Sequence, residues 1–453
     1  MDPNGYWNPR HETLPRPHLE ELQLTRLRAA VARARAAPGP QGRLLREAGV
    51  RPEDLTRLDD VRRIPFFTRD AWMDAQQAAP PYGGLTAAPP DAAVRRHLTS
   101  GTSGKQPLRV LDGPEDWEWI SEMWCYAFWG FGVRPRDRVF LAFGYGSFIG
   151  FWGAHYACEK IGCLTLPGGN MTTETRLRQI LDDEATVVCS TPTYALRLAQ
   201  EARRLGIDLA AGPVGRVLLS GEPAGSIPAT KRLIESEWGA RTADTAGMTE
   251  LGTVFMFECE NRPGGGHIIE DNFLEEVVDP VTGEPVPYGR QGERVVTSFG
   301  RGFLPLLRYR TRDLVVRAPA GRCGCGRTWD LYDGGIRGRV DDMLLVRGTN
   351  VYPRAIEAVV REHPEIDEFQ IHLYTRDGIR EEIDVLIEVP GHRGTDGNLA
   401  ARLAKSLGAA AGGLRVGVRE VAAGSLPRFE LKARRVRDER IVIGGGDTRE
   451  ATG

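Results

Sequence analysis

The 453-residue chain is long enough for two or three domains and one large hydrophobic core. Its 59 Lys and Arg residues nearly balance its 61 Asp and Glu residues, so the net charge of −2 gives no overall basic field for nucleic acid. The first residues lack the basic and apolar regions of a secretory signal peptide, and we expect a cytoplasmic protein.

One uncharged run, residues 139–158, is long enough to cross a bilayer. It contains four glycines, several aromatic residues and His155, and charged residues flank it on both sides. These features favour buried backbone around an aromatic pocket, so we expect no association with a membrane.

The predicted elements begin with an amphipathic helix over 18–37, which the Pro38-Gly39-Pro40 break ends. Short helices and loops follow, and a strand over 94–98 leads into a glycine-rich stretch. From there helical and strand patterns alternate, which is typical of a layered α/β architecture with much parallel sheet. The predicted helices cover 115–130, 174–183, 193–205 and 231–238, and the predicted strands cover 138–143, 163–167, 186–190 and 215–220.

The pattern changes twice in the second half of the chain. Strand pairs over 275–298, broken by Pro-Val-Thr-Gly-Glu-Pro, predict antiparallel structure. Beyond about residue 338 the strands and helices form a stretch of ordinary domain size. Its predicted strands are 367–374 and 382–388, and its predicted helices lie near 353–363 and 397–407. We expect a large α/β domain with an antiparallel β subdomain, residues 1–340, and a small mobile α+β domain, residues 341–453.

The stretch from His97 to Pro107 has the chemistry of a phosphate-binding loop. Glycines let backbone N–H groups approach an anion closely, hydroxyls add donors, and Lys105 adds a positive charge. Only two residues separate Gly101 from Gly104, so this is not a Walker loop. Taken alone, the stretch is equally consistent with a flexible Ser/Gly turn.

Five further motifs follow this loop in order. They are Ser220-Gly-Glu-Pro223, Ala246-Gly-Met-Thr-Glu250, Tyr309-Arg-Thr-Arg-Asp-Leu314, Gly338-Arg-Val-Asp-Asp-Met-Leu-Leu-Val-Arg-Gly-Thr-Asn-Val-Tyr-Pro353 and Leu426-Pro-Arg-Phe-Glu-Leu-Lys-Ala-Arg434. Their order and spacing resemble the adenylate-forming superfamily of acyl-CoA synthetases, peptide-synthetase adenylation domains and luciferases. Phe143-Gly-Tyr-Gly with Gly153-Ala-His-Tyr156, and the Asn350-Val-Tyr-Pro segment, resemble the phenylacetate–CoA ligase family more closely. The resemblance covers about residues 60–440.

This resemblance implies an ATP-dependent aryl-acid ligase, which forms acyl-AMP and pyrophosphate and then an acyl thioester. Coenzyme A is the expected thiol acceptor, and the alternative is the phosphopantetheine arm of a carrier protein in a biosynthetic pathway. The expected cofactors are ATP and Mg²⁺, and the expected substrate is a small aromatic carboxylic acid. The sequence leaves the choice between a monomer and a homodimer open. Another alternative is a non-catalytic relative, or one that only adenylates and stops at acyl-AMP. The neutral charge and the order of the motifs disfavour a zinc-ribbon nucleic-acid binder.

The resemblance also assigns roles to matching residues. Glu250 and Thr249 match the Mg²⁺ and α-phosphate position, where a carboxylate suits a hard cation. Lys432 matches the catalytic lysine that reaches the substrate carboxylate and the α-phosphate, and Asp341 matches the hinge. The β- and γ-phosphates would lie on Thr99, Ser100, Gly101, Thr102, Ser103, Gly104 and Lys105. The other nucleotide positions are Gly221, Glu222, Pro223, Ala246, Gly247, Met248, Asp313 (ribose hydroxyls) and Arg339 (ribose or phosphate).

Two residues depart from the family pattern. Ala246 stands where the family has an aromatic residue that stacks on adenine, and Arg312 stands where it has a glycine. The resemblance places the acyl pocket around Tyr145, Phe148 and His155. Phe148, with the neighbouring Phe151 and Trp152, would provide aromatic walls suited to a benzoate or arylacetate, although these side chains are equally consistent with core packing.

The seven cysteines are scattered, which argues against a secreted disulfide framework. Cys125, Cys158, Cys163 and Cys189 lie in apolar surroundings typical of core thiols. The remaining set, Cys259, His267, Cys323 and Cys325, is typical of a tetrahedral structural zinc site, and similar cysteines occur in some relatives. The alternative is a chance Cys-x-Cys pair with a surface histidine.

Overall fold

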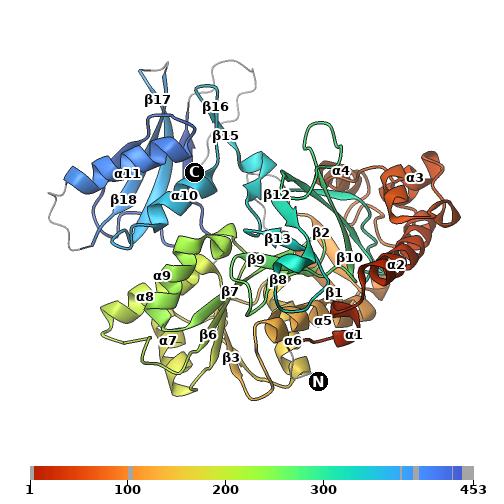
Figure 1. The fold of residues 1–453 in the computed structure, drawn as a ribbon, viewed down its shortest axis with the longest axis horizontal. Helices are drawn as coiled ribbons and strands as arrows, with labels where there is room; N and C mark the ends of the chain where they lie inside the picture. The colour runs from red at the N-terminus through yellow and green to blue at the C-terminus, as the bar shows by residue number, and fades with distance from the viewer. Residues whose placement is uncertain (1–4, 100–105, 378–379, 391–396, 431, 441–453) are drawn as a thin grey trace. The chain divides into compact units, whose positions relative to one another are not determined.

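The computed structural model describes residues 5–99, 106–377, 380–390, 397–430 and 432–440 (Figure 1). The chain divides into two compact units. The large unit is Met1–Asp341 together with Glu430–Lys432, and the small unit is Asp342–Phe429 and Ala433–Gly453. The main-chain division therefore falls between Asp341 and Asp342.

In the described part of the large unit, a twelve-stranded mixed sheet runs in the order β10-β11-β12-β13-β9-β8-β7-β6-β5-β3-β4, with β14 paired to β12. Its parallel strands are β3 (Arg138–Leu141), β4 (Leu164–Pro167), β5 (Val187–Ser190), β6 (Arg216–Ser220) and β7 (Arg241–Met248). The antiparallel strands are β8 (Thr253–Glu258), β9 (Gly265–Ile268), β10 (Phe273–Val278), β11 (Gln291–Ser298), β12 (Tyr309–Ala318), β13 (Leu331–Asp333) and β14 (Gly338–Arg339). The antiparallel region predicted over 275–298 thus continues the parallel sheet.

Helices cover both faces of the parallel strands. They are α5 (Pro114–Gly130), α6 (Gly150–Ile161), α7 (Thr173–Asp182), α8 (Pro192–Arg204) and α9 (Pro228–Trp238). Successive residues of β5 belong to different cores, because Val187 and Cys189 pack with α5 and α6 whereas Val188 packs with α8 and α9. A strand buried on both faces reads as a continuous apolar run, which is why the sequence predicts these strands well. The expected layered α/β architecture is confirmed.

Residues 9–112 form helices, 3₁₀ turns and one two-stranded hairpin outside the twelve-stranded sheet. These are α1 (Pro9–Glu12), α2 (Arg16–Ala36), α3 (Pro40–Glu47) and α4 (Arg69–Ala78), the 3₁₀ turns Pro52–Asp54, Leu58–Arg63 and Pro90–Ala92, and the hairpin of β1 (Arg95–Leu98) and β2 (Arg109–Asp112). Three more 3₁₀ turns lie at Pro223–Ser226, Ala320–Arg322 and Val340–Asp342.

The small unit has its own apolar core. Its sheet has the order β19-β18-β17-β20, formed by β17 (Glu368–Arg376), β18 (Arg380–Glu388), β19 (Gly417–Glu420) and β20 (Val436–Glu439). The other elements are the hairpin of β15 (Leu344–Val346) and β16 (Thr349–Val351) and the helices α10 (Pro353–Arg361) and α11 (Gly397–Ala410).

The uncharged run 139–158 includes most of the predicted strand over 138–143 and a helix that the sequence analysis does not predict. It contains β3, a loop and most of α6. Gly153 lies inside α6, where a Cβ would come within 2.7 Å of the Trp124 ring on α5. The absence of a side chain therefore lets the two helices approach closely. No helix in the described part of the chain has both the length and the apolar character to cross a membrane.

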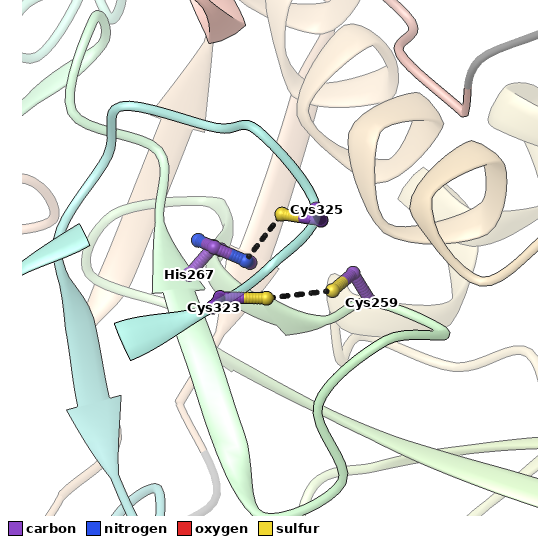
Figure 2. Close-up of side chains that lie close together, drawn as sticks. All are labelled: Cys259, His267, Cys323 and Cys325. Carbon is purple, nitrogen blue, oxygen red and sulfur yellow. Dashed lines mark hydrogen bonds between the residues drawn. The ribbon is translucent and has the colours of Figure 1, made fainter. Parts of the chain in front are cut away.

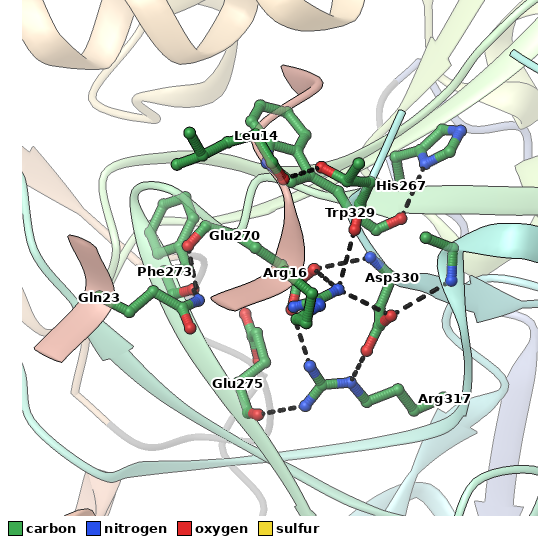
Figure 3. Close-up of polar contacts among 12 residues, drawn as sticks. Leu14, Arg16, Gln23, His267, Glu270, Phe273, Glu275, Arg317, Trp329 and Asp330 are labelled. Atoms are coloured by element: carbon green, nitrogen blue, oxygen red, sulfur yellow. Dashed lines mark hydrogen bonds and ion pairs between the residues drawn. The ribbon is translucent and has the colours of Figure 1, made fainter. Parts of the chain in front are cut away.

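A network of buried ion pairs joins the start of α2 to the ends of the loop between β12 and β13 (Figure 3). Arg16 donates to both carboxylate oxygens of Glu270, at 3.1 and 2.8 Å, and to Asp330 at 2.9 Å. Arg317 donates to Glu270 at 2.7 Å and to Asp330 at 2.8 Å. Each buried carboxylate therefore bridges two guanidinium groups, and the network fixes the N-terminal segment on the sheet.

We expect Glu270→Gln to lower the free energy of unfolding of the large unit by about 2–4 kcal/mol, because it leaves two partly buried guanidinium groups with one carboxylate. Urea unfolding followed by tryptophan fluorescence measures this change. The matched control is Glu284→Gln on an exposed turn, which should change the value by less than about 0.5 kcal/mol. Equal effects of the two substitutions would contradict a stabilising role for the network.

Candidate active site

The described ends of the glycine-rich loop are held by the β1–β2 hairpin. Thr99 is buried, its N–H donates to the carbonyl of Leu108 at 3.1 Å, and its hydroxyl accepts from the N–H of Leu108 at 2.9 Å. The hairpin therefore closes the loop at Thr99 and Leu108. The other loop residues with an expected role, Ser100, Gly101, Thr102, Ser103, Gly104 and Lys105, lie outside the described residues.

Thr249 and Glu250 lie in the buried turn between β7 and β8. The fully buried Arg301 donates to the carbonyl of Glu250 at 2.7 Å and forms an ion pair with Asp112 at the end of β2. One guanidinium thus holds the turn of Glu250 against the hairpin that carries the glycine-rich loop.

Arg69, the first residue of α4, joins the same two segments from another side. Its guanidinium lies 3.0 Å from the Glu250 carboxylate and 3.3 Å from the Thr99 hydroxyl. Sequence reasoning misses this residue, because an arginine after a helix-capping threonine is typical of an exposed helix start, and its partner Glu250 is 181 positions away.

Asp313 and Arg339 are paired neighbours on β12 and β14, and Arg339 lies 3.5 Å from the Asp313 carboxylate. Burial raises the pKa of Asp313, and the positive charges of Arg339 and Arg294 oppose that shift. Arg339 also donates to both oxygens of the exposed Asp341, at 2.8 and 3.0 Å. The Asp341 carboxylate is therefore tied to a residue of the expected nucleotide site.

The charges of the expected site act on the buried hydroxyl of Tyr309. Burial raises its pKa well above the usual value, Glu250 and Asp313 raise it further, and Arg69 and Arg339 lower it. The structure therefore pairs the residues expected from the motifs in two ion pairs, Glu250 with Arg69 and Asp313 with Arg339.

Arg312, which replaces the expected glycine, has a positive φ of 64°. A side chain is rarely found in that conformation, so glycine would be the less strained residue. The Arg312 guanidinium lies 3.4 Å from Asp70 on α4, in an exposed ion pair.

The residues expected to surround the nucleotide base lie at the ends of neighbouring strands. Gly221 follows β6 with a φ of 94°, and the Glu222 carboxylate accepts from the N–H of Thr193 at the start of α8, at 3.0 Å. Pro223 begins a 3₁₀ turn. The segment Ala246-Gly-Met248 ends β7, with a bulge between its first two residues.

Lys432 belongs to the short segment Glu430–Lys432 that groups with the large unit. Within that unit its ammonium nitrogen lies 5.3 Å from the ring centroid of Phe148. A lysine over an aromatic face is a favourable cation–π arrangement.

The expected acyl-pocket residues form a polar chain beside aromatic rings. The Tyr145 hydroxyl lies 3.0 Å from Nδ1 of His155, and Nε2 of that ring lies 3.2 Å from Glu159. Burial raises the pKa of Tyr145. The rings of Tyr145 and Trp152 are 4.8 Å apart, whereas Phe151 is only 3% exposed and packs in the main core. Phe151 is therefore part of the core.

Cys259, His267, Cys323 and Cys325 converge, with one potential ligand atom from each within 4.8 Å of the others (Figure 2). β9 carries the histidine and pairs with both β8 and β13, which brings the two cysteine segments together. The Cys259 and Cys323 sulfurs are 3.6 Å apart, and the Cys325 sulfur lies 3.3 Å from Nε2 of His267. Contacts with the other two thiols and the imidazole lower the pKa of Cys325, which favours a thiolate there.

Comparison with known proteins shows the family of this chain. It is 36% identical to the phenylacetate-coenzyme A ligase of Thermus thermophilus over 84% of each chain. It is 35% identical to the phenylacetate-coenzyme A ligase of Pseudomonas putida, with 94% of this chain and 95% of that protein covered. The chain belongs to the phenylacetate–CoA ligase family. The resemblance seen in the motifs is therefore confirmed.

Two further matches agree with this family of ligases. Residues 348–440 match the AMP-binding enzyme C-terminal domain family. A solved structure of 2-hydroxyisobutyryl-CoA ligase in complex with 2-HIB-AMP superimposes with a TM-score of 0.90 at 29% identity, covering 97% of this chain and 93% of that one. The phenylacetate–CoA ligase family member described here is thus an acyl-CoA ligase of the adenylate-forming superfamily, which uses ATP and coenzyme A.

Proposed function

We propose that this ligase activates a small aromatic carboxylic acid and transfers the acyl group to coenzyme A. The observation that supports an aromatic acid is the group of half-buried rings of Tyr145, Phe148 and Trp152, with the Lys432 ammonium over one of them. Flat apolar walls with one cation match the shape and charge of an aryl carboxylate. Two of the relatives named above are phenylacetate-coenzyme A ligases.

In the first half-reaction, a carboxylate oxygen bonds to the α-phosphorus of ATP while the bond to pyrophosphate breaks. Two anions must meet, so positioning and charge neutralisation provide most of the catalysis. Lys432 would hold the substrate carboxylate and the α-phosphate, and Asp313 would accept from the ribose hydroxyls. Glu250 and Thr249 offer the hard oxygen ligands that suit Mg²⁺, whose positive charge would neutralise the phosphates.

In the second half-reaction, the thiol sulfur bonds to the acyl carbon, AMP leaves, and the thiol proton passes to solvent. Lys432 would have to withdraw before the thiol enters, so we propose that residues 341–453 act as a mobile domain with Asp341 as its hinge. The division of the compact units at Asp341 supports this position for a hinge. The carrier-protein thiol is the alternative acceptor.

We also propose a structural zinc ion on Cys259, His267, Cys323 and Cys325. The distances of 3.6 and 3.3 Å between ligand atoms suit a tetrahedral site, in which neighbouring ligands are about 3.3–3.8 Å apart. Nδ1 of His267 faces the carbonyl of Trp329 at 3.4 Å, which orients Nε2 toward the thiols. Four protein ligands leave no open position, so the ion would stabilise the loop and take no part in the reaction.

The proposed substrate class can be tested with a panel of benzoate, phenylacetate, hexanoate and octanoate. We expect kcat/KM for pyrophosphate release to be at least about tenfold higher for the better aryl acid, because the aromatic walls favour a flat ring. Mass analysis with coenzyme A and with a holo carrier protein identifies the acceptor. Preference for an aliphatic acid would contradict the aryl proposal, and acylation of the carrier alone would contradict coenzyme A as acceptor.

For Lys432→Ala we expect acid-dependent ATP–pyrophosphate exchange to fall by at least about a hundredfold, because the developing negative charge loses its cation. Thioester formation from supplied acyl-AMP should stay within about threefold of the wild type, since that step does not need the lysine. Lys405→Ala, on helix α11, is the control. Wild-type exchange in the Lys432 variant would show that another residue has this role.

We expect about one zinc ion per chain in protein purified without added zinc, measured by plasma mass spectrometry. Replacing both Cys323 and Cys325 by serine should remove it, because two of the four ligands are lost. Cys163→Ser, at a core cysteine outside the cluster, should keep it. Zinc retained by the double variant, or absent from the wild type, would reject the site.

A further inference from the structure

The backbone that precedes α4 positions the start of the helix, and thus Arg69, beside β12. The N–H of Phe67 donates to the carbonyl of Arg308 at 3.0 Å, and the N–H of Arg310 donates to the carbonyl of Phe67 at 2.9 Å. Phe67 thus pairs with Tyr309 on β12, the strand that carries Asp313. Thr68 then caps α4 by accepting from Ala71 at 3.2 Å. The helix start is therefore fixed to the strand of the expected ribose site.

The side chain of Arg69 bridges two segments with different expected tasks. Thr99 begins the loop expected to hold the β- and γ-phosphates, and Glu250 is the expected magnesium ligand. The guanidinium contacts both, at 3.3 and 3.0 Å, and its side chain is 22% exposed, so it lies at the accessible surface between them. A planar guanidinium has five N–H donors, and these two contacts engage two of its nitrogens.

The positive charge of an arginine in this position complements the negative charge of the ATP phosphates. Guanidinium groups recognise phosphates by paired, charge-assisted hydrogen bonds. A Mg²⁺ ion held by Glu250 would neutralise part of the carboxylate charge, so the carboxylate would be a weaker partner for Arg69. The guanidinium would then have donors available for phosphates bound beside Thr99.

We propose that Arg69 binds the β- and γ-phosphates of ATP and, after adenylation, the pyrophosphate that leaves. In the free enzyme the same guanidinium keeps Glu250 and the stem of the glycine-rich loop in place. The proposal rests on the proposed roles of Thr99 and Glu250, but it does not depend on which acid the enzyme uses.

The test is calorimetric titration of the full chain with an α,β-methylene ATP analogue plus Mg²⁺, and separately with AMP. For Arg69→Met we expect the Kd of the analogue to rise about ten- to a hundredfold, as for loss of charge-assisted hydrogen bonds. The Kd of AMP, which lacks the β- and γ-phosphates, should change by less than about threefold. Arg69→Lys should restore part of the affinity, because it keeps the charge but loses the paired geometry.

Arg62→Met is the matched control, since it makes the same substitution at an exposed arginine, whose ion pair with Asp59 lies within the 3₁₀ turn Leu58–Arg63. It should bind both ligands as the wild type does. Unchanged binding of the analogue by Arg69→Met would overturn the proposal, and so would an equal loss of analogue and AMP binding with a lower Tm, which indicates a structural role. These titrations contain no carboxylic acid and no coenzyme A, so their result does not depend on the aryl-acid proposal. The substrate panel tests that proposal separately.

Discussion

The candidate active site depends on two contacts of the fully buried Arg301 guanidinium. It joins Asp112 on the hairpin of the glycine-rich loop to the backbone carbonyl of Glu250. Burial raises the pKa of Asp112, but Arg301 and His97 oppose this and hold it below its usual value. A buried charge without its partner costs about 3–5 kcal/mol, so separation of the two segments is strongly disfavoured.

A second buried assembly joins the N-terminal segment to the cysteine loop. The Tyr6 hydroxyl donates to the carbonyl of Cys325 at 2.6 Å, and Arg327 donates to the buried carboxylate of Glu12 at 2.6 Å. The Glu270–Asp330 network lies at the base of the same loop. The loop has little regular structure of its own, so side-chain contacts, together with a metal ion if bound, must replace the backbone hydrogen bonds of a strand or helix.

The sequence predicts most helices and strands because their periodicity is a local property of the chain. It does not reveal the helical part of 139–158, since low helix propensity at Gly150 and Gly153 hides a helix that packing against α5 stabilises. Motif order identifies the family and the candidate residues. It cannot identify Arg69 or Arg301, whose partners are far away in sequence and whose residue type is common on protein surfaces.

Lysine is rare in this chain, and its positions bear on the proposed phosphate contacts. Of the 59 basic residues, five are lysines: Lys105, Lys160, Lys231, Lys405 and Lys432. Two of the five are the positions that the family motifs assign to phosphates. Arginine forms paired, directional bonds, as Arg339 does with Asp341, and such bonds hold a side chain in one place. A lysine is a compact charge on a flexible stem, so it can follow a phosphate group whose geometry changes during the reaction. Lysine is not always movable in this chain, because Lys231 is buried and forms an ion pair with Glu258. At the two positions proposed to contact phosphates, however, a flexible point charge suits the task better than a paired guanidinium.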